Sequence, residues 1–237
     1  MKQWLLIMST LVLCSCALTG RHVERSEATT DSSRPLSEGL QSYDVEHYTL
    51  RNEILVDKKA ISGSSMIRFA AVREMDTLEL DFDGLFTIDG IEDDRGSLDY
   101  TRDEAKLYVK LREPVAAGNS STVTVHYHGV PLEAARAPWD GGFVWSETPG
   151  GKPWIATAMQ GEGCDIWWPC KDHPTDEPDS MLMSFTVQDP LICVSNGQYL
   201  GSVSNGNGTS TFEWFISTPI NNYNVSIYAA ESVSYTH

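Results

Sequence analysis

The stretch MQGEGCDIWWPCKDHPTDEPD, from Met159 to Asp179, combines three prolines, two glycines and many acidic side chains with two tryptophans and two cysteines. Proline and glycine at this density exclude a long helix or a central strand. The sequence on both sides alternates between apolar and polar residues. Loops held on a rigid scaffold often carry binding groups. We therefore expect a functional loop on a β scaffold.

Outward from this loop, period-two alternation predicts a series of short strands separated by turn signals. The expected strands are 43–50, 60–69, 77–82, 86–91, 106–111, 121–127, 181–188, 192–196, 209–215 and 224–229. Strands 106–111 and 121–127 are expected to pair with each other. Gly63 suggests a β-bulge in the strand 60–69. Residues 131–152 are expected to form an irregular segment. The predicted fold is all-β, an antiparallel β saddle or sandwich.

Two of the expected strands place particular side chains. Alternation in 43–50 puts Tyr43, Val45 and His47 on one face. In 121–127 and just beyond, His126 and His128 share the other side of a strand whose Val and Tyr residues face inward. Without a third ligand nearby, we favour hydrogen-bonded surface histidines over a metal pair.

The first residues have the features of an export signal. Lys2 precedes a short apolar run, too short to span a bilayer, and Leu13-Cys14-Ser15-Cys16 resembles a bacterial lipobox. This predicts a lipoprotein-type signal over 1–16 with lipidation of Cys16; an ordinary secretory signal is the alternative. Residues 17–42 read as a flexible tether and 43–237 as the β domain. The expected address is exported, periplasmic or anchored at the outer membrane of a bacterium.

The formal net charge is −16 and the sequence pI is about 4.6. Nucleic-acid binding requires clustered Lys and Arg, so this balance argues against a nucleic-acid partner. An acidic protein can attract cationic groups such as peptide amines.

Cys164, Cys170 and Cys193 remain after the two signal cysteines. A bridge between Cys164 and Cys170 is open, but the odd cysteine leads us to favour buried free thiols. The His residues do not lie at zinc-site spacing from these cysteines, so we expect no metal site in this chain. A Cys–His nucleophile pair with His173 is less favoured than packing.

Gln160 and Glu162 alternate on what reads as an extended segment, so both should point the same way. A carboxylate beside an amide suits a protonated amine; a polar loop rim is the alternative. We expect Asp172 to cap the loop backbone and Asp176 to Asp179 to form a solvated turn. No His-Glu-x-x-His, Gly-x-Ser-x-Gly, phosphate-loop or dinucleotide motif is present, so no catalytic residue is assigned.

Three groups of residues, in this order, match one known pattern: Tyr43-Asp44-Val45-x-His47-Tyr48-x-Leu50 with Gly63 and Ile67-x-Phe69; Gln160-Gly161-Glu162 with Trp168-Pro169-Cys170-Lys171-Asp172-x-Pro174; and Thr218-Pro219 to Ala229. The chain resembles the N-terminal domain of the aminopeptidase N family of zinc metallopeptidases, which includes the leukotriene hydrolases. The family's usual Arg before the aromatic-Pro-Cys block is absent, and Asp165-Ile166-Trp167 stands near its place.

The resemblance implies a β saddle that covers a separate catalytic domain. It implies that Glu162 binds the N-terminal amine of a peptide and that Gln160 lines the first substrate pocket. Zinc is expected in the catalytic domain, whose Gly-x-Met-Glu-Asn and His-Glu-x-x-His motifs this chain lacks. We therefore expect part of an exported aminopeptidase that is inactive alone and meets the catalytic domain through an apolar face near its Trp-rich loops.

Two other interpretations stay open. The chain could be a stand-alone lipid-anchored β module for binding or interaction, derived from such an enzyme. A carbohydrate-binding sandwich would rest on exposed tryptophans, the candidates being Trp139, Trp145, Trp154, Trp167 and Trp168. Buried or interface positions are more common for such residues.

Overall fold

The computed structural model describes residues 34–231. Within this range the secondary structure consists of β-strands with three short 3-10 helices, η2 (Leu40–Ser42), η3 (Val56–Lys58) and η4 (Asn222–Asn224). The predicted all-β class is confirmed. The strands are β1 (Tyr43–Leu55), β2 (Ala60–Ala71), β3 (Met75–Asp81), β4 (Phe86–Asp93), β5 (Gly96–Ser97), β6 (Tyr100–Asp103), β7 (Lys106–Val115), β8 (Ser120–Gly129), β9 (Gly142–Glu147), β10 (Pro153–Ala158), β11 (Ser180–Gln188), β12 (Leu191–Ser195), β13 (Gln198–Ser204), β14 (Thr209–Ile216) and β15 (Ile227–Glu231).

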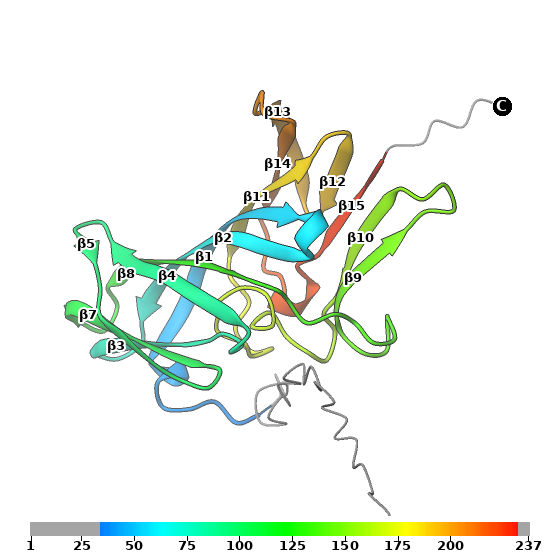
Figure 1. The fold of residues 1–237 in the computed structure, drawn as a ribbon. Helices are drawn as coiled ribbons and strands as arrows, with labels where there is room; N and C mark the ends of the chain where they lie inside the picture. Colours follow the sequence, from blue (N-terminus) through cyan, green and yellow to red (C-terminus); the bar gives the residue numbers. More distant parts are fainter. Residues whose placement is uncertain (1–33, 232–237) are drawn as a thin grey trace, which may run out of the picture.

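Three sheets make up the molecule (Figure 1). The large sheet has the order β13-β14-β11-β1-β2-β8-β4-β5, and the smaller sheets have the orders β12-β15-β10-β9 and β3-β7-β6. The four-stranded and three-stranded sheets lie toward opposite ends of the large sheet in this view. Pairing between the named strands is antiparallel except that β1 and β11 run parallel. Because these two strands are far apart in the chain, local alternation carries no information on their relative direction.

The sequence missed β5, β6, β9, β10 and β13. The side chains of β13 are almost all exposed. This edge strand buries neither face, so its sequence lacks the alternating pattern by which a strand is recognised. The expected pairing of 106–111 with 121–127 was wrong: β7 pairs with β3 and β6, whereas β8 pairs with β2 and β4. Both strands alternate, but alternation does not specify the partner.

Two register predictions need correction. The β1–β2 pairing shifts between Val45 and His47. Tyr43 and Val45 are buried, as predicted. After the shift the buried face continues through Tyr48 and Leu50, and His47, which was expected on that face, is only half-buried. Gly63 lies in regular pairing rather than in a bulge. A Cβ there would lie 2.0 Å from the Arg51 carbonyl oxygen, so close backbone approach accounts for this glycine.

The last part of the expected tether is packed against the domain. Leu40 is buried, the Ser37 hydroxyl donates to the Glu79 carboxylate at 2.7 Å, and Arg34 forms an ion pair with the buried Asp81. The packed domain thus includes residues 34–42. The expected signal over 1–16, the lipidation residue Cys16 and the tether up to residue 33 lie outside the described residues. Residues 34–231 contain no helix long and apolar enough to cross a bilayer.

Candidate functional site

Gln160 and Glu162 lie on a tight turn that follows β10, not on an extended segment. The backbone N–H groups of Glu162 and Gly163 both donate to the Met159 carbonyl at 3.1 Å. Gly161 and Gly163 each have φ of 88°, a left-handed conformation that favours glycine. Gln160 is exposed and Glu162 is partly exposed. Both side chains therefore belong to the surface of the molecule, as expected, although the backbone between them turns.

A glycine in the loop before β9 sets the position of Glu162. A Cβ built on Gly141 would lie 2.1 Å from Cγ of Glu162. The carboxylate stem therefore rests directly on the Gly141 backbone, and any larger residue at that position would displace it. Glu162 is supported by main chain on one side and partly accessible on the other.

Gln160 borders an open pocket between the end of β10, β15 and η4. The pocket is also lined by Pro138, Ala158, Asn196, Tyr223 and Tyr228, among others. The lining combines amide and hydroxyl groups with apolar surface. The sequence does not reveal these residues, because no local pattern connects four separate segments of the chain. The Gln160 amide oxygen can accept a hydrogen bond from a protonated amine at this pocket; Glu162 lies on the same turn but does not line the pocket.

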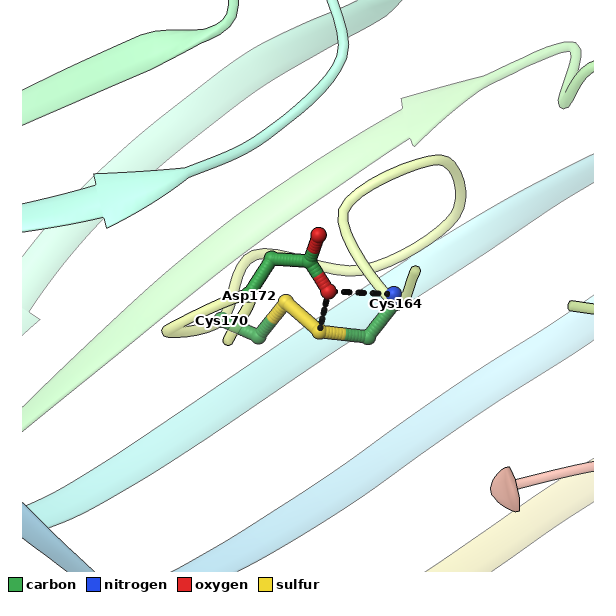
Figure 2. A group of neighbouring side chains, drawn as sticks. All are labelled: Cys164, Cys170 and Asp172. Atoms are coloured by element: carbon green, nitrogen blue, oxygen red, sulfur yellow. Dashed lines mark hydrogen bonds between the residues drawn. A yellow bond between two sulfur atoms is a disulfide. The ribbon is translucent and has the colours of Figure 1, made fainter. Parts of the chain in front are cut away.

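Residues 163–172 of the Met159–Asp179 segment are buried. Cys164 and Cys170 form a disulfide (Figure 2), so the expectation of free thiols at these two positions was wrong. The backbone N–H groups of Trp167 and Trp168 both donate to the Cys164 carbonyl at 3.1 Å, and this turn folds the chain back on itself. The backbone N–H of Cys164 donates to Asp172 Oδ1 at 3.0 Å, which confirms the capping role predicted for Asp172. Cys193 is a free buried thiol.

Among the residues that the structure describes, Cys164, Cys170 and Asp172 come together as candidate metal ligands, with ligand atoms within 4.8 Å of one another. Zinc binds cysteine as the thiolate, and both sulfurs are taken up by the disulfide, as Figure 2 shows. This group therefore does not fit zinc. The disulfide also removes the thiol of any Cys–His nucleophile pair, and His173 instead contacts the Thr175 hydroxyl at 2.7 Å.

Lys171 and Asp176 form an ion pair in the interior. The expected solvated turn over 176–179 was therefore wrong at Asp176, whereas Glu177 and Asp179 are exposed as predicted. The side chains of Lys171 and Asp176 are 7% and 3% exposed, and the Lys171 ammonium also donates to the Tyr43 carbonyl at 2.6 Å. Burial raises the pKa of the Asp176 carboxyl, against the opposing attraction of Lys171. The pair joins the segment to β1.

The tryptophans divide into two groups. Trp167 and Trp168 are fully buried, and Trp145 packs partly buried against the core. Trp168 contacts Tyr48 edge-on, with ring centroids 4.7 Å apart. Only Trp139 and Trp154 of the five candidates are strongly exposed, so the row of exposed aromatics required for a sugar-binding surface does not form.

The strand histidines behave as predicted. His126 and His128 are solvent-facing and pair with Glu92 at 2.9 Å and Asp89 at 2.8 Å, respectively. Each imidazole has its own carboxylate partner.

Comparison with known proteins matches residues 44–223 to the family model described as the peptidase M1 N-terminal domain. The chain is 21% identical over 201 residues to Leucine aminopeptidase 2 of Vanderwaltozyma polyspora, covering 82% of this chain and 29% of that protein. The M1 zinc metallopeptidase of Deinococcus radiodurans has a similar fold, with a TM-score of 0.69 at 20% identity, over 84% of this chain and 44% of that one.

Leukotriene A4 hydrolase from Saccharomyces cerevisiae has a TM-score of 0.63 at 21% identity, over 89% of this chain and 32% of that one. This chain thus spans less than half the length of the relatives it matches. The family model covers most of the described strands, from the start of β1 to η4. The chain belongs to the family of peptidase M1 N-terminal domains.

Proposed function

We propose that this chain is the substrate-amine-binding domain of an exported zinc aminopeptidase, which removes N-terminal residues from peptides. In this proposal Glu162 binds the free ammonium of the peptide, and Gln160 lines the pocket that receives its first residue. The observation that carries the proposal is the glycine-framed turn. It holds both side chains at the surface, with Gln160 lining an open pocket, while residues 163–172 are buried.

The chemistry expected of this chain is recognition of the substrate. A carboxylate neutralises the ammonium, and the Gln160 amide oxygen can accept a further hydrogen bond from it. The Gly141 backbone beneath Glu162 restricts the movement of the carboxylate stem, so less side-chain freedom is lost on binding. Zinc, which would activate the attacking water, would be held by a separate catalytic domain.

The disulfide supports the proposed export. Disulfides persist in oxidising compartments such as the bacterial periplasm and are rare in the cytosol. Together with the lipobox-like Leu13 to Cys16, this favours a periplasmic or outer-membrane-anchored protein with lipid on Cys16. Mass spectrometry of the mature N-terminus tests this address: a lipid-modified Cys16 is expected, and an unmodified N-terminus elsewhere would contradict it.

Kinetics of the Glu162→Gln variant test the amine-binding role. In the complete enzyme, with its catalytic domain present, kcat/KM for aminoacyl substrates should fall about 10- to 100-fold. A hydrogen bond to a charged group contributes about 1.5–3 kcal/mol, and tenfold corresponds to about 1.4 kcal/mol. Glu147→Gln is the matched control, because Glu147 is an exposed carboxylate on the neighbouring β9.

A second measurement separates amine binding from general loss of structure. Free-amine peptides should inhibit the wild-type enzyme more strongly than their N-acetylated forms, and Glu162→Gln should remove that difference. Unchanged kinetics and an unchanged preference for the free amine would exclude Glu162 from the site. A chain that never operates with a catalytic domain would instead support the stand-alone lipid-anchored module.

A further inference from the structure

The edge strand β13 is flanked by three Asn-Gly pairs, which are Asn196-Gly197, Asn205-Gly206 and Asn207-Gly208. The first pair precedes β13, and the other two form the turn that joins β13 to β14. Figure 1 shows this turn projecting from the edge of the large sheet. Asn205 and Asn207 are exposed, whereas Asn196 is half-buried. The same dipeptide therefore occurs in three different surroundings.

An asparagine followed by glycine can cyclise, because glycine has no side chain to shield its backbone nitrogen. That nitrogen gives its proton to a hydroxide ion and attacks the side-chain carbonyl carbon, Cγ. A new N–C bond forms, the bond between Cγ and Nδ2 breaks, and the amide leaves as ammonia after taking a proton from water. Water then opens the succinimide ring at either carbonyl, which gives aspartate or isoaspartate.

The folded turn prepares Asn207 for this reaction. The backbone N–H and the hydroxyl of Thr209 both donate to Asn207 Oδ1, at 3.2 and 2.7 Å. This contact two residues ahead closes the side chain over the Gly208 peptide, whose nitrogen is the nucleophile. Both donors also stabilise the negative charge that develops on Oδ1 as the new bond forms. Gly208 has φ of 83° and no atom within 4 Å of a Cβ built there, so its nitrogen is open to solvent base.

The leaving groups of Asn207 and Asn205 differ. Within residues 34–231, no hydrogen bond holds the amide nitrogen of Asn207. The amide nitrogen of Asn205 instead donates to the hydroxyls of Thr209 and Thr211 on β14, at 2.9 and 3.1 Å. The Thr211 hydroxyl approaches Asn205 Oδ1 only to 3.5 Å. The fold therefore polarises the carbonyl of Asn207 but ties down the leaving group of Asn205.

Asn196 is held in place by packing. The backbone N–H and the hydroxyl of Ser226, just before β15, donate to Asn196 Oδ1 at 2.8 and 3.0 Å. A Cβ built on Gly197 would lie 2.3 Å from the Phe215 carbonyl oxygen. The Gly197 peptide is therefore pressed against β14 and cannot turn freely toward the Asn196 side chain, although that carbonyl is also hydrogen-bonded.

We propose that Asn207 is a site of spontaneous deamidation in the folded protein, and that it reacts ahead of Asn205 and Asn196. The reaction requires only water and hydroxide, and it does not depend on the function proposed above. Its product adds one negative charge to the exposed turn, and isoaspartate also adds one carbon to the main chain. Both changes fall beside Asp189, whose backbone N–H donates to the Gly208 carbonyl at 2.9 Å. Deamidation should therefore weaken the contact between this turn and the connection from β11 to β12.

Peptide mapping by mass spectrometry, after ageing of the chain in mildly alkaline buffer, tests the proposal. Asn207 should deamidate about 2- to 10-fold faster than Asn205, the rate equivalent of one ordinary hydrogen bond, and Asn196 should be slowest. In guanidinium chloride the three sites should react at similar rates, because each is followed by glycine and the folded surroundings are lost. Equal rates in the folded chain, or the same ranking with and without denaturant, would overturn the proposal.

Thr209→Val separates the two asparagines of the turn, because the Thr209 hydroxyl donates to Asn207 Oδ1 and accepts from Asn205 Nδ2. Valine keeps the shape and the backbone N–H but removes this hydroxyl. Deamidation of Asn207 should slow by about 2- to 10-fold, whereas that of Asn205 should become faster. Ser202→Val removes an exposed hydroxyl of β13 away from the turn and should change neither rate. Unchanged rates in Thr209→Val, or a shift of both rates in the same direction, would contradict the proposal.

Discussion

At the scale of single residues, the Lys171 ammonium has more internal partners than an ordinary surface lysine. It pairs with Asp176, donates to the Tyr43 carbonyl, and lies 4.8 Å from the centroid of the Tyr43 ring. Lys171→Met should destabilise the chain by about 3–5 kcal/mol, because it leaves the Asp176 carboxylate buried without its counter-ion. Urea unfolding followed by tryptophan fluorescence measures the change.

A surface pair provides the control for this prediction. Lys152 and Glu231 form an ion pair with side chains 57% and 29% exposed. Lys152→Met should change the unfolding free energy by no more than about 1 kcal/mol. The double variant Lys171→Met/Asp176→Leu should recover part of the loss, since no charge is then stranded. A single variant Lys171→Met as stable as wild type would contradict the structural role of the pair.

At the scale of the strands, β2 is central in the large sheet and its Gly63 is required by close packing. A methyl group at position 63 would lie 2.0 Å from the Arg51 carbonyl oxygen and 2.4 Å from Asn52 Oδ1 on β1. Gly63→Ala should destabilise the domain by about 1–3 kcal/mol, the usual cost of overpacking. Chemical denaturation measures it.

Gly90 on β4 is the matched position, because no atom lies within 4 Å of a Cβ built there. Gly90→Ala should leave stability within about 1 kcal/mol of wild type. If both substitutions had the same effect, conformational freedom of glycine would explain them and the close contact of β1 with β2 would not.

At the scale of the whole molecule, the segment after Cys164 connects the three sheets. The backbone of Cys170 forms an isolated antiparallel β-bridge with Asp81 of β3. The Pro169 carbonyl accepts a hydrogen bond from the Ser65 hydroxyl of β2, and the Trp167 ring contacts Phe143 of β9 edge-on. The Lys171 N–H donates to the Tyr48 hydroxyl of β1. The loop that interrupts the alternating sequence is therefore an internal junction, and only its first turn reaches the candidate site.

The disulfide closes this junction, which gives a prediction for the entire fold. Replacing both Cys164 and Cys170 with Ser should lower the unfolding free energy by roughly 2 kcal/mol, the loop-closure entropy of a short cross-linked loop. Wild-type protein unfolded with a reductant present should show a similar loss. Identical denaturation midpoints with and without reductant would indicate that the cysteines are not bonded.

Part of this structure is encoded locally and could be predicted. Alternation in β8 predicted that Val123, Val125 and Tyr127 face the core and that His126 and His128 face solvent, as they do. The same periodicity predicted the all-β class. The sequence also indicated that Gln160 and Glu162 lie at the surface. The backbone between them was predicted wrongly, because the glycines that set the turn were read as part of an extended segment.

The remaining features depend on contacts between distant parts of the chain. Burial of Asp176, pairing of Cys164 with Cys170, the parallel contact of β1 with β11 and the pocket beside Gln160 each involve residues that no local pattern relates. The sequence by itself determined the β class and the two faces of a regular strand such as β8, because side-chain period follows from backbone geometry. Only the tertiary structure decided which polar and aromatic residues lie inside, because burial depends on what packs against them.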